Sequence, residues 1–162
     1  MSIQKTKGFT LIELLVVITL IGIFASIVMV ALTSAKNDSV DTAIQANVNK
    51  LQTQAELYYS NNNNYGANPV AYSSVCPTSE IASTTAGMLG VSKTGLLAFT
   101  TALVQQVGSA HTLCTVAANG TAWAVAVQLK GDTTKVACVD GTGRSKISVT
   151  TLASAITSSV CN

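Results

Sequence analysis

The segment from Phe9 to Leu32 constrains the fold most, because it is almost entirely apolar and holds one charged side chain, Glu13. Its roughly 24 residues, at a helical rise of about 1.5 Å each, are enough to span a bilayer. The basic residues Lys5 and Lys7 lie just before it. Because positive charge is retained on the cytoplasmic side of a span, we expect the leader inside and the chain after Leu32 outside.

The residues around this boundary form a specific motif. A short basic leader ends at Gly8, and Phe-Thr-Leu-Ile-Glu-Leu follows from Phe9. This pattern resembles the class III signal peptide of type IV pilins and pseudopilins. The resemblance implies that a prepilin peptidase cleaves between Gly8 and Phe9, that the new amino terminus on Phe9 is methylated, and that the apolar helix stays in the mature protein. An ordinary secretory signal has a shorter apolar core, which is removed.

The resemblance also assigns a role to Glu13 in subunit docking. It implies that the amine of Phe9 meets the Glu13 carboxylate of an adjacent subunit in the assembled filament. A competing interpretation is that Glu13 folds back onto its own helix terminus, where it would favour the positive end of the helix dipole.

A structural subunit of a type IV pilus-like extracellular filament is therefore the expected function, in adhesion, motility or DNA uptake. The implied partners are copies of the chain and other pilins in a helical filament, the prepilin peptidase, an inner-membrane assembly platform with a separate ATPase, and the membrane before assembly. The implied location is a single-pass cytoplasmic membrane protein and then an extracellular pilus. Two alternatives stay open: a pseudopilin of a type II secretion system, or a minor pilin with an adhesive or DNA-binding head.

The helix is predicted to continue beyond the apolar segment on one face only. One set of apolar residues recurs at steps that average 3.6 residues, and polar residues lie opposite. The apolar stripe comprises Val40, Ile44, Val48, Leu51, Ala55 and Tyr58, and the opposite face Lys36, Asp38, Asp41, Gln45, Asn49, Lys50, Gln52 and Glu56. We expect a helix from Phe9 to Ser60, about 78 Å long, that ends at four asparagines, Asn61 to Asn64.

This helix lacks the proline that many type IV pilins carry a few residues after a glycine. The chain has Gly22, but Val30 occupies the proline position. Valine keeps the backbone donor and avoids the steric clash of proline, a difference of about 3 kcal/mol. The sequence therefore predicts an uninterrupted helix in the isolated subunit.

The head is predicted to be a small α+β unit, an antiparallel β-meander on the long helix (the pilin fold). A short helix should open near Ser92 or Thr94, carry Leu96 to Val107 and stop at Gly108. Strands are expected at Thr112 to Ala117, Thr121 to Leu129, Lys135 to Asp140 and Lys146 to Val149, with Asn119-Gly120 as a hairpin signal. Alanines line one face of the second strand, and we expect the long helix against them. The predicted organisation is a leader (1–8), a transmembrane and assembly half-helix (9–32), an amphipathic half-helix (33–62) and a head (63–162).

All four cysteines, Cys76, Cys114, Cys138 and Cys161, lie in the head. An even number in an exported domain favours disulfides, and four cysteines allow three connectivities. Pilins often attach their C-terminal tail to the sheet, so the resemblance implies Cys138 with Cys161 and Cys76 with Cys114. A zinc site is disfavoured, since there is no Cys-x-x-Cys pair and His111 is the single histidine.

We expect no enzyme, no cofactor and no metal. His111 has no nearby nucleophile motif, and neither a Gly-x-Ser-x-Gly elbow nor a phosphate-binding loop is present. Asp132 and Asp140 are interpreted as turn residues that bind nearby backbone, in preference to calcium.

DNA is a weakly supported partner. The basic residues Lys130, Lys135, Arg144 and Lys146 gather in the C-terminal hairpins, but the interleaved Asp132 and Asp140 reduce the positive charge of that region. Cleavage of the leader would remove Lys5 and Lys7 and leave 9 − 2 = 7 basic and 7 acidic side chains. The surface of the mature chain is therefore expected to be nearly neutral.

Overall fold

The computed structural model describes residues 8–66, 71–80, 87–90 and 96–162. The chain forms two compact units, residues 1–36 and residues 37–162. The first helix, α1 (Leu11–Asn62), contributes to both units. The second unit contains the amphipathic half of α1 and the head, and it holds the hydrophobic core.

Helix α1 is continuous through Gly22 and Val30, as the absence of proline predicts. It begins two residues later and ends two residues later than the sequence pattern suggests. The asparagines close it: the side-chain amides of Asn61 and Asn62 donate to the carbonyls of Leu57 and Tyr58, both at 2.9 Å. They are additional bonds to carbonyls of the last turns, and the chain leaves the helix at Asn63, which has a φ of 56° and donates its N–H to the carbonyl of Tyr59 at 2.7 Å.

The head contains a five-stranded antiparallel sheet in the order β1-β2-β3-β4-β5, which confirms the predicted α+β meander. A separate two-stranded hairpin, β6 and β7, follows at the C-terminus. The described elements are β1 (Tyr72–Ser74), η1 (Gly87–Gly90), α3 (Leu96–Val107), η3 (Ser109–His111), β2 (Thr112–Val116), β3 (Trp123–Gln128), β4 (Lys135–Asp140), β5 (Ser145–Val149), η4 (Leu152–Ser154), β6 (Ile156–Thr157) and β7 (Val160–Cys161). The sequence pattern does not indicate β1, β6 or β7. The helix start predicted at Ser92 or Thr94 lies outside the described residues.

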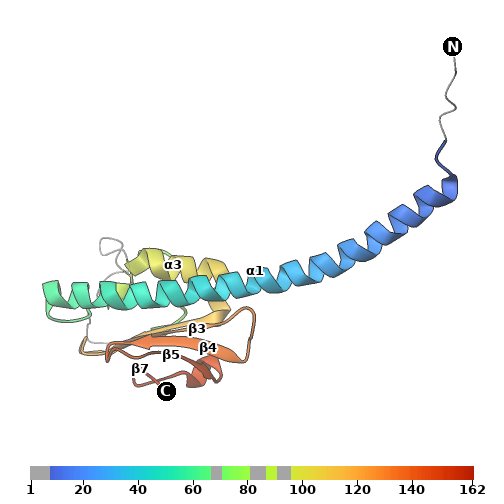
Figure 1. Cartoon of the computed structure of the whole chain (residues 1–162). Helices are drawn as coiled ribbons and strands as arrows, with labels where there is room; N and C mark the ends of the chain where they lie inside the picture. Colours follow the sequence, from blue (N-terminus) through green and yellow to red (C-terminus); the bar gives the residue numbers. More distant parts are fainter. Residues whose placement is uncertain (1–7, 67–70, 81–86, 91–95) are drawn as a thin grey trace, which may run out of the picture. The chain divides into compact units, whose positions relative to one another are not determined.

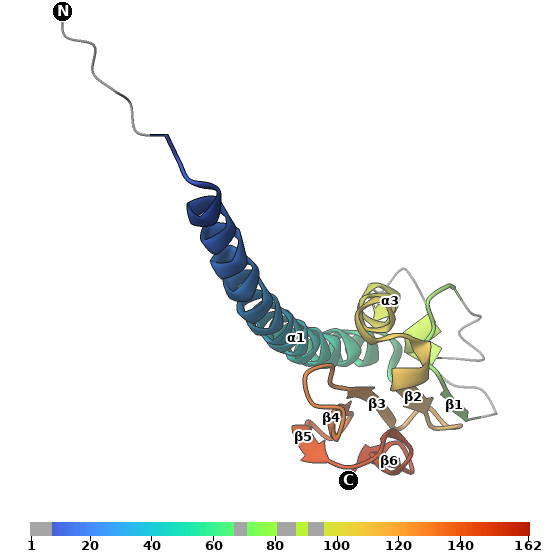
Figure 2. The same cartoon turned by 90° about the vertical axis from the view of Figure 1, so that its right-hand side faces the viewer.

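The amphipathic half of α1 and helix α3 lie on the same side of the sheet (Figures 1 and 2). The predicted apolar stripe of α1 is confirmed, since Ile44, Val48, Leu51 and Ala55 are buried and Val40 and Tyr58 are partly buried against the same core. Its partners come from one face of the sheet and from α3, namely Trp123, Val125, Val127, Val139, Leu96 and Leu103. This core determines which side of the head α1 occupies.

The expectation that α1 packs on the alanine face of β3 is wrong. Ala124 and Ala126 are buried beneath the C-terminal tail, in a second cluster with Ala155 and Cys161. Figure 2 shows the β6 segment on the side of the sheet opposite α1 and α3. The large side chains Trp123, Val125 and Val127 offer more apolar area, so they take the helix, and the small alanines allow a thin tail to approach closely.

The hairpin predicted at Asn119-Gly120 is present, but its turn is not the two-residue type. Strands β2 and β3 are joined by a longer loop in which the N–H of Gly120 donates to the carbonyl of Ala117 (2.9 Å). Gly120 has a φ of 65°, whereas Asn119 is not among the residues with positive φ. A type I′ turn requires positive φ at both positions, so the loop here is instead a type I turn followed by a left-handed glycine.

Candidate assembly site at the start of the long helix

The N-terminal unit exposes a long series of apolar side chains. Leu11 is 82% exposed, Phe24 65% and Val30 73%. By length and composition, α1 is able to cross a membrane, and it is the one such helix in the part of the chain that the structure describes. Water solvates such a surface poorly, so this half of the helix requires lipid or other helices around it.

Glu13 and Thr10 form a reciprocal pair at the start of α1. Glu13 Oε2 accepts hydrogen bonds from the N–H of Thr10 (2.8 Å) and from its hydroxyl (2.7 Å). In return, the N–H of Glu13 donates to Thr10 Oγ1 at 3.3 Å. Because Leu11 is the first helical residue, this arrangement is a capping box. It satisfies two backbone donors that a helix start leaves without partners.

A sequence signal for this capping box is present in Thr10-Leu11-Ile12-Glu13. It has the spacing of a threonine at the cap and a glutamate three residues later, directly before an apolar run. Glu13 therefore folds back onto its own helix terminus in the structure. Its partner there is Thr10, three residues away, and not Phe9, four residues away.

The capping box leaves one carboxylate oxygen available. Both bonds from Thr10 go to Oε2, and among the described residues Oε1 accepts no hydrogen bond. Phe9, Ile12, Glu13, Val16 and Val17 line a shallow hollow of about 330 Å³ beside it. The site thus combines an oriented negative charge with apolar walls. Such a site suits a cation attached to an apolar segment.

Gly8 and Phe9 precede the helix and are exposed, with Phe9 at 73%. A Cβ added to Gly8 would have no atom within 4 Å, so no steric contact requires glycine there.

Comparisons with known proteins identify the family of the chain. Residues 3–33 match the family model described as the prokaryotic N-terminal methylation motif. The chain is also 32% identical, over 130 residues, to the "Type IV wide pilus major component PilA4" of Thermus thermophilus. That alignment covers 79% of this chain and 86% of the relative. The chain belongs to the type IV pilin family. No solved structure matches this pilin significantly.

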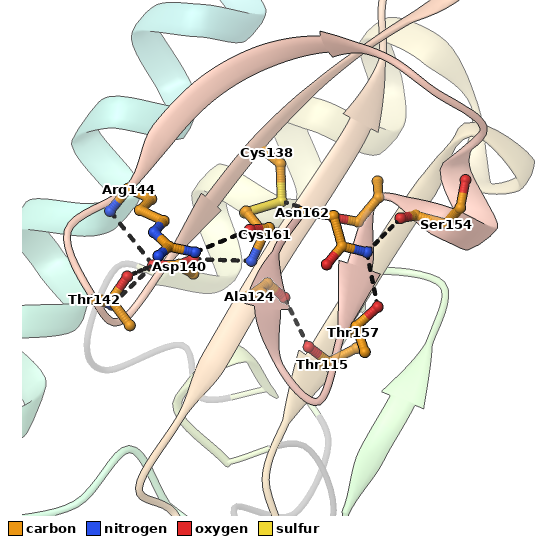
Figure 3. The surroundings of a disulfide bond; sticks show 11 residues. Thr115, Ala124, Cys138, Asp140, Thr142, Arg144, Ser154, Thr157, Cys161 and Asn162 are labelled. Atoms are coloured by element: carbon orange, nitrogen blue, oxygen red, sulfur yellow. Dashed lines mark hydrogen bonds between the residues drawn. A yellow bond between two sulfur atoms is a disulfide. The ribbon is translucent and has the colours of Figure 1, made fainter.

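The pilin head contains two disulfides, Cys76–Cys114 and Cys138–Cys161, which is the pairing that the resemblance implies. The first joins the segment after β1 to β2, and the second joins β7 to β4. Figure 3 shows the second disulfide and its surroundings. It attaches the tail over the alanine face of the sheet.

Asp140 binds nearby backbone in its turn, as expected, but it is also completely buried beside this disulfide. Its Oδ1 accepts from the N–H and hydroxyl of Thr142 (2.8 and 2.6 Å) and, more weakly, from the N–H of Arg144 (3.4 Å). Its Oδ2 accepts from the N–H of Cys161 at 2.8 Å. Burial raises the pKa of the Asp140 carboxyl, but hydrogen bonds from Thr142, Cys161 and Arg144 outweigh burial, and the pKa is lowered.

The residues considered for DNA binding or catalysis are mostly engaged elsewhere in this pilin. Lys135 pairs with Asp132 at 3.0 Å, Lys130 Nζ donates to the carbonyl of Gln106, and Arg144 donates to the carbonyl of Cys161. His111 is exposed, with its Nδ1 against Gln128 Oε1. In the described segments, no group of three or more His, Cys, Asp or Glu is placed to hold a metal ion.

Proposed function

We propose that this pilin is a structural subunit of a type IV pilus-like filament and that it polymerises through α1. The arrangement of Glu13 carries the proposal: an oriented carboxylate begins a helix whose apolar side chains are exposed. The tertiary structure of the subunit leaves this surface uncovered. Neighbouring helices in a filament would cover it and would exclude lipid and water.

Maturation is proposed to occur at Gly8 and Phe9. Prepilin peptidase would cleave between them, and methylation would leave a cationic secondary amine on Phe9. Cleavage also removes Lys5 and Lys7, which would otherwise hold the terminus in the cytoplasm. The mature terminus could then leave the membrane with α1.

Docking is proposed to join the Phe9 amine of an incoming subunit to the Glu13 of a subunit already in the filament. Opposite charges attract strongly in a low-dielectric bundle. Either charge left alone would lose its hydration without compensation, a desolvation penalty on the order of several kcal/mol. Thr10 already holds Oε2, so Oε1 is oriented for the amine. This pairing would set the axial register of neighbouring subunits, because nonpolar side chains alone permit many registers.

Other proteins are required for this cycle. The proposed partners are copies of the chain and other pilins, prepilin peptidase, the membrane before assembly, and an inner-membrane platform with a separate ATPase. The relative is named as a major component of a pilus, which favours a major subunit over a pseudopilin or a minor pilin. A DNA-binding head gains no support, since three of the four basic residues considered contact groups of the protein.

The docking proposal is tested with Glu13→Ala, Glu13→Gln and Thr10→Val, each expressed as the sole full-length pilin. Glu13→Ala and Glu13→Gln should give cleaved subunits that stay in the membrane and form few or no filaments. Thr10→Val should leave the charge in place but lose its orientation and the cap, a loss of about 1 kcal/mol, and should therefore assemble partially. Sheared filaments and membrane-retained subunit are quantified for each variant. Normal filaments built only of Glu13→Ala protein would contradict docking.

Processing is tested separately by mass spectrometry of the mature pilin. The expected terminus is methylated Phe9. Gly8→Leu should retain the leader and fail to assemble, while the conservative variant Gly8→Ala should be cleaved at least in part. A mature wild-type chain that still begins at Met1 or Ser2 would contradict cleavage at Gly8.

A further inference from the structure

Strand β5 forms one edge of the sheet, and two large apolar side chains on it are exposed. Ile147 is 43% exposed and Val149 75%. Among the described residues no strand pairs with the outer side of β5. Natural proteins usually protect such an edge with charges or cover it, and β5 carries a single lysine, Lys146. Its apolar residues therefore form an unusually accessible edge.

Both apolar side chains point to the side of the sheet that carries α1. Ile147 lies opposite Ala137 in the β4–β5 register, and Ala137 belongs to the core under the helix. Residues directly opposite in an antiparallel pair share a face, and alternate residues of a strand do too. Ser145 shares that face and donates to Asn49 Oδ1 of α1 at 2.7 Å. The helix thus reaches the start of β5 and leaves the rest uncovered.

A groove of about 290 Å³ separates α1 from β5. Val48 and Ala137 line it together with Gln45 and Asn49 of the helix and Ile147 of the strand. Sites for small molecules usually measure at least about 300 Å³ and are predominantly apolar. This groove is at the lower limit of that size and has mixed polarity. It therefore suits one or two side chains of another protein better than a small ligand.

A second copy of the chain is the occupant that these features fit. Gln45, Val48 and Asn49 lie on α1, the helix whose apolar half is proposed to pack against other subunits, and the chain belongs to a family that builds pili from such subunits. The mature chain has equal numbers of basic and acidic side chains, so its copies do not repel strongly at long range. Head-to-tail packing in a filament brings different surfaces of each copy together, and such a contact repeats without closing.

We propose that Ile147, Val149 and the adjoining groove beside Val48 form a head contact with the neighbouring copy in the filament. This inference rests on the proposed function. It assigns β5 to subunit packing, in addition to the contact between Phe9 and Glu13. In the free subunit the edge stays exposed, and in the filament it is buried.

A photo-crosslinking experiment tests the contact. Val149 is replaced by p-benzoylphenylalanine in the full-length pilin, and the same is done at Ser148, whose side chain points to the opposite face of the same strand. Irradiation of sheared filaments should give covalent dimers and higher multimers of the pilin for position 149. Position 148 should give markedly fewer, and the membrane-held monomer of the position 149 variant should give none.

Charge substitutions provide a second measurement. Val149→Lys should reduce filament yield about tenfold or more, whereas Ser148→Lys adds the same charge and should leave yield within about twofold. Val149 is largely exposed, so the subunit should still fold, which correct disulfides and normal membrane levels would verify. Filaments that form from the position 149 photo-variant without pilin crosslinks, or with crosslinks to another protein, would overturn this inference and leave the filament proposal intact. Absence of filaments from wild-type protein would instead contradict the proposed function.

Discussion

The carboxylate of Asp140, at the end of β4, binds the backbone N–H of Cys161 on β7 at 2.8 Å. The same side chain organises the β4–β5 turn through Thr142 and Arg144. One buried charge therefore links the turn to the tail, next to the disulfide that joins Cys138 and Cys161 (Figure 3). The tail is held by a covalent bond and by this carboxylate.

Asp140→Ala should destabilise the head by about 2–3 kcal/mol, because it leaves buried backbone donors such as the N–H of Cys161 without an acceptor. The free energy of unfolding is measured by denaturant titration of the full-length pilin in detergent. Asp132→Ala is the matched control, since Asp132 is an exposed turn aspartate with similar local bonds, and it should cost clearly less because water replaces the lost acceptor. Equal effects of the two variants would contradict a linking role for Asp140.

The pH dependence of stability follows from the lowered pKa of Asp140. A free aspartate has a pKa of about 3.9, so near that pH the unfolded chain binds more protons at this site than the folded chain. Its stabilisation is complete above about pH 5 and decreases as the pH falls through the lowered pKa of the folded state. The melting temperature between pH 7 and pH 2 should decrease more steeply for wild type than for Asp140→Asn. Parallel curves would disprove this assignment.

Asp41 of α1 attaches the helix to the β3–β4 loop. Its carboxylate accepts the N–H groups of Lys130 (2.6 Å) and Gly131 (3.0 Å), although the sequence pattern places it on the polar face. Asp41→Ala should lower the free energy of unfolding by about 1–3 kcal/mol, since bonds to a charged acceptor are lost. Asp38→Ala, one turn earlier on α1, is the control and should have a smaller effect in the same denaturant titration.

Gly66 and Gly87 approach each other too closely for side chains. Both have positive φ (75° and 58°), and a Cβ on Gly66 would lie 2.8 Å from the Cα of Gly87. Gly66→Ala should destabilise the head by about 2–4 kcal/mol through backbone strain and steric overlap. Gly143→Ala is the comparison for strain alone, because φ is 86° there but the atom nearest to an added Cβ would be Gln52 Nε2 at 3.6 Å, an ordinary contact distance. Melting temperatures should rank wild type above Gly143→Ala and Gly143→Ala above Gly66→Ala.

The turn between β6 and β7 places two serines in the left-handed region, Ser158 (φ 52°) and Ser159 (φ 60°). Such a type I′ turn favours Asn-Gly, because non-glycine residues are strained there by about 1–2 kcal/mol each. Ser159→Gly should therefore raise the melting temperature. Ala153→Gly, in the neighbouring η4 segment without positive φ, should lower it slightly. A decrease for Ser159→Gly would show that the turn is not strained.

Features with a local cause were predictable from the sequence. The apolar segment, the stripe from Val40 to Tyr58 and the uninterrupted passage from Gly22 to Val30 depend on periodicity and propensity, which neighbouring residues determine. Strand β4 matches its predicted bounds, Lys135 to Asp140, for the same reason. The capping box of Thr10 and Glu13 is equally local and readable. The disulfide pairing came from the family resemblance, because four cysteines alone leave three choices.

Only the tertiary structure decided which partners meet across long sequence separations. Both faces of β3 are apolar, so the alternating pattern could not tell which face takes α1 and which takes the tail. Along the chain, Asp41 lies on the polar face of a helix and Asp140 begins a turn, and their acceptor roles depend on Lys130 and Cys161, which folding brings to them. Periodicity specifies that a face is buried, whereas the choice of partner depends on the volumes and hydrogen-bond geometry of the whole core.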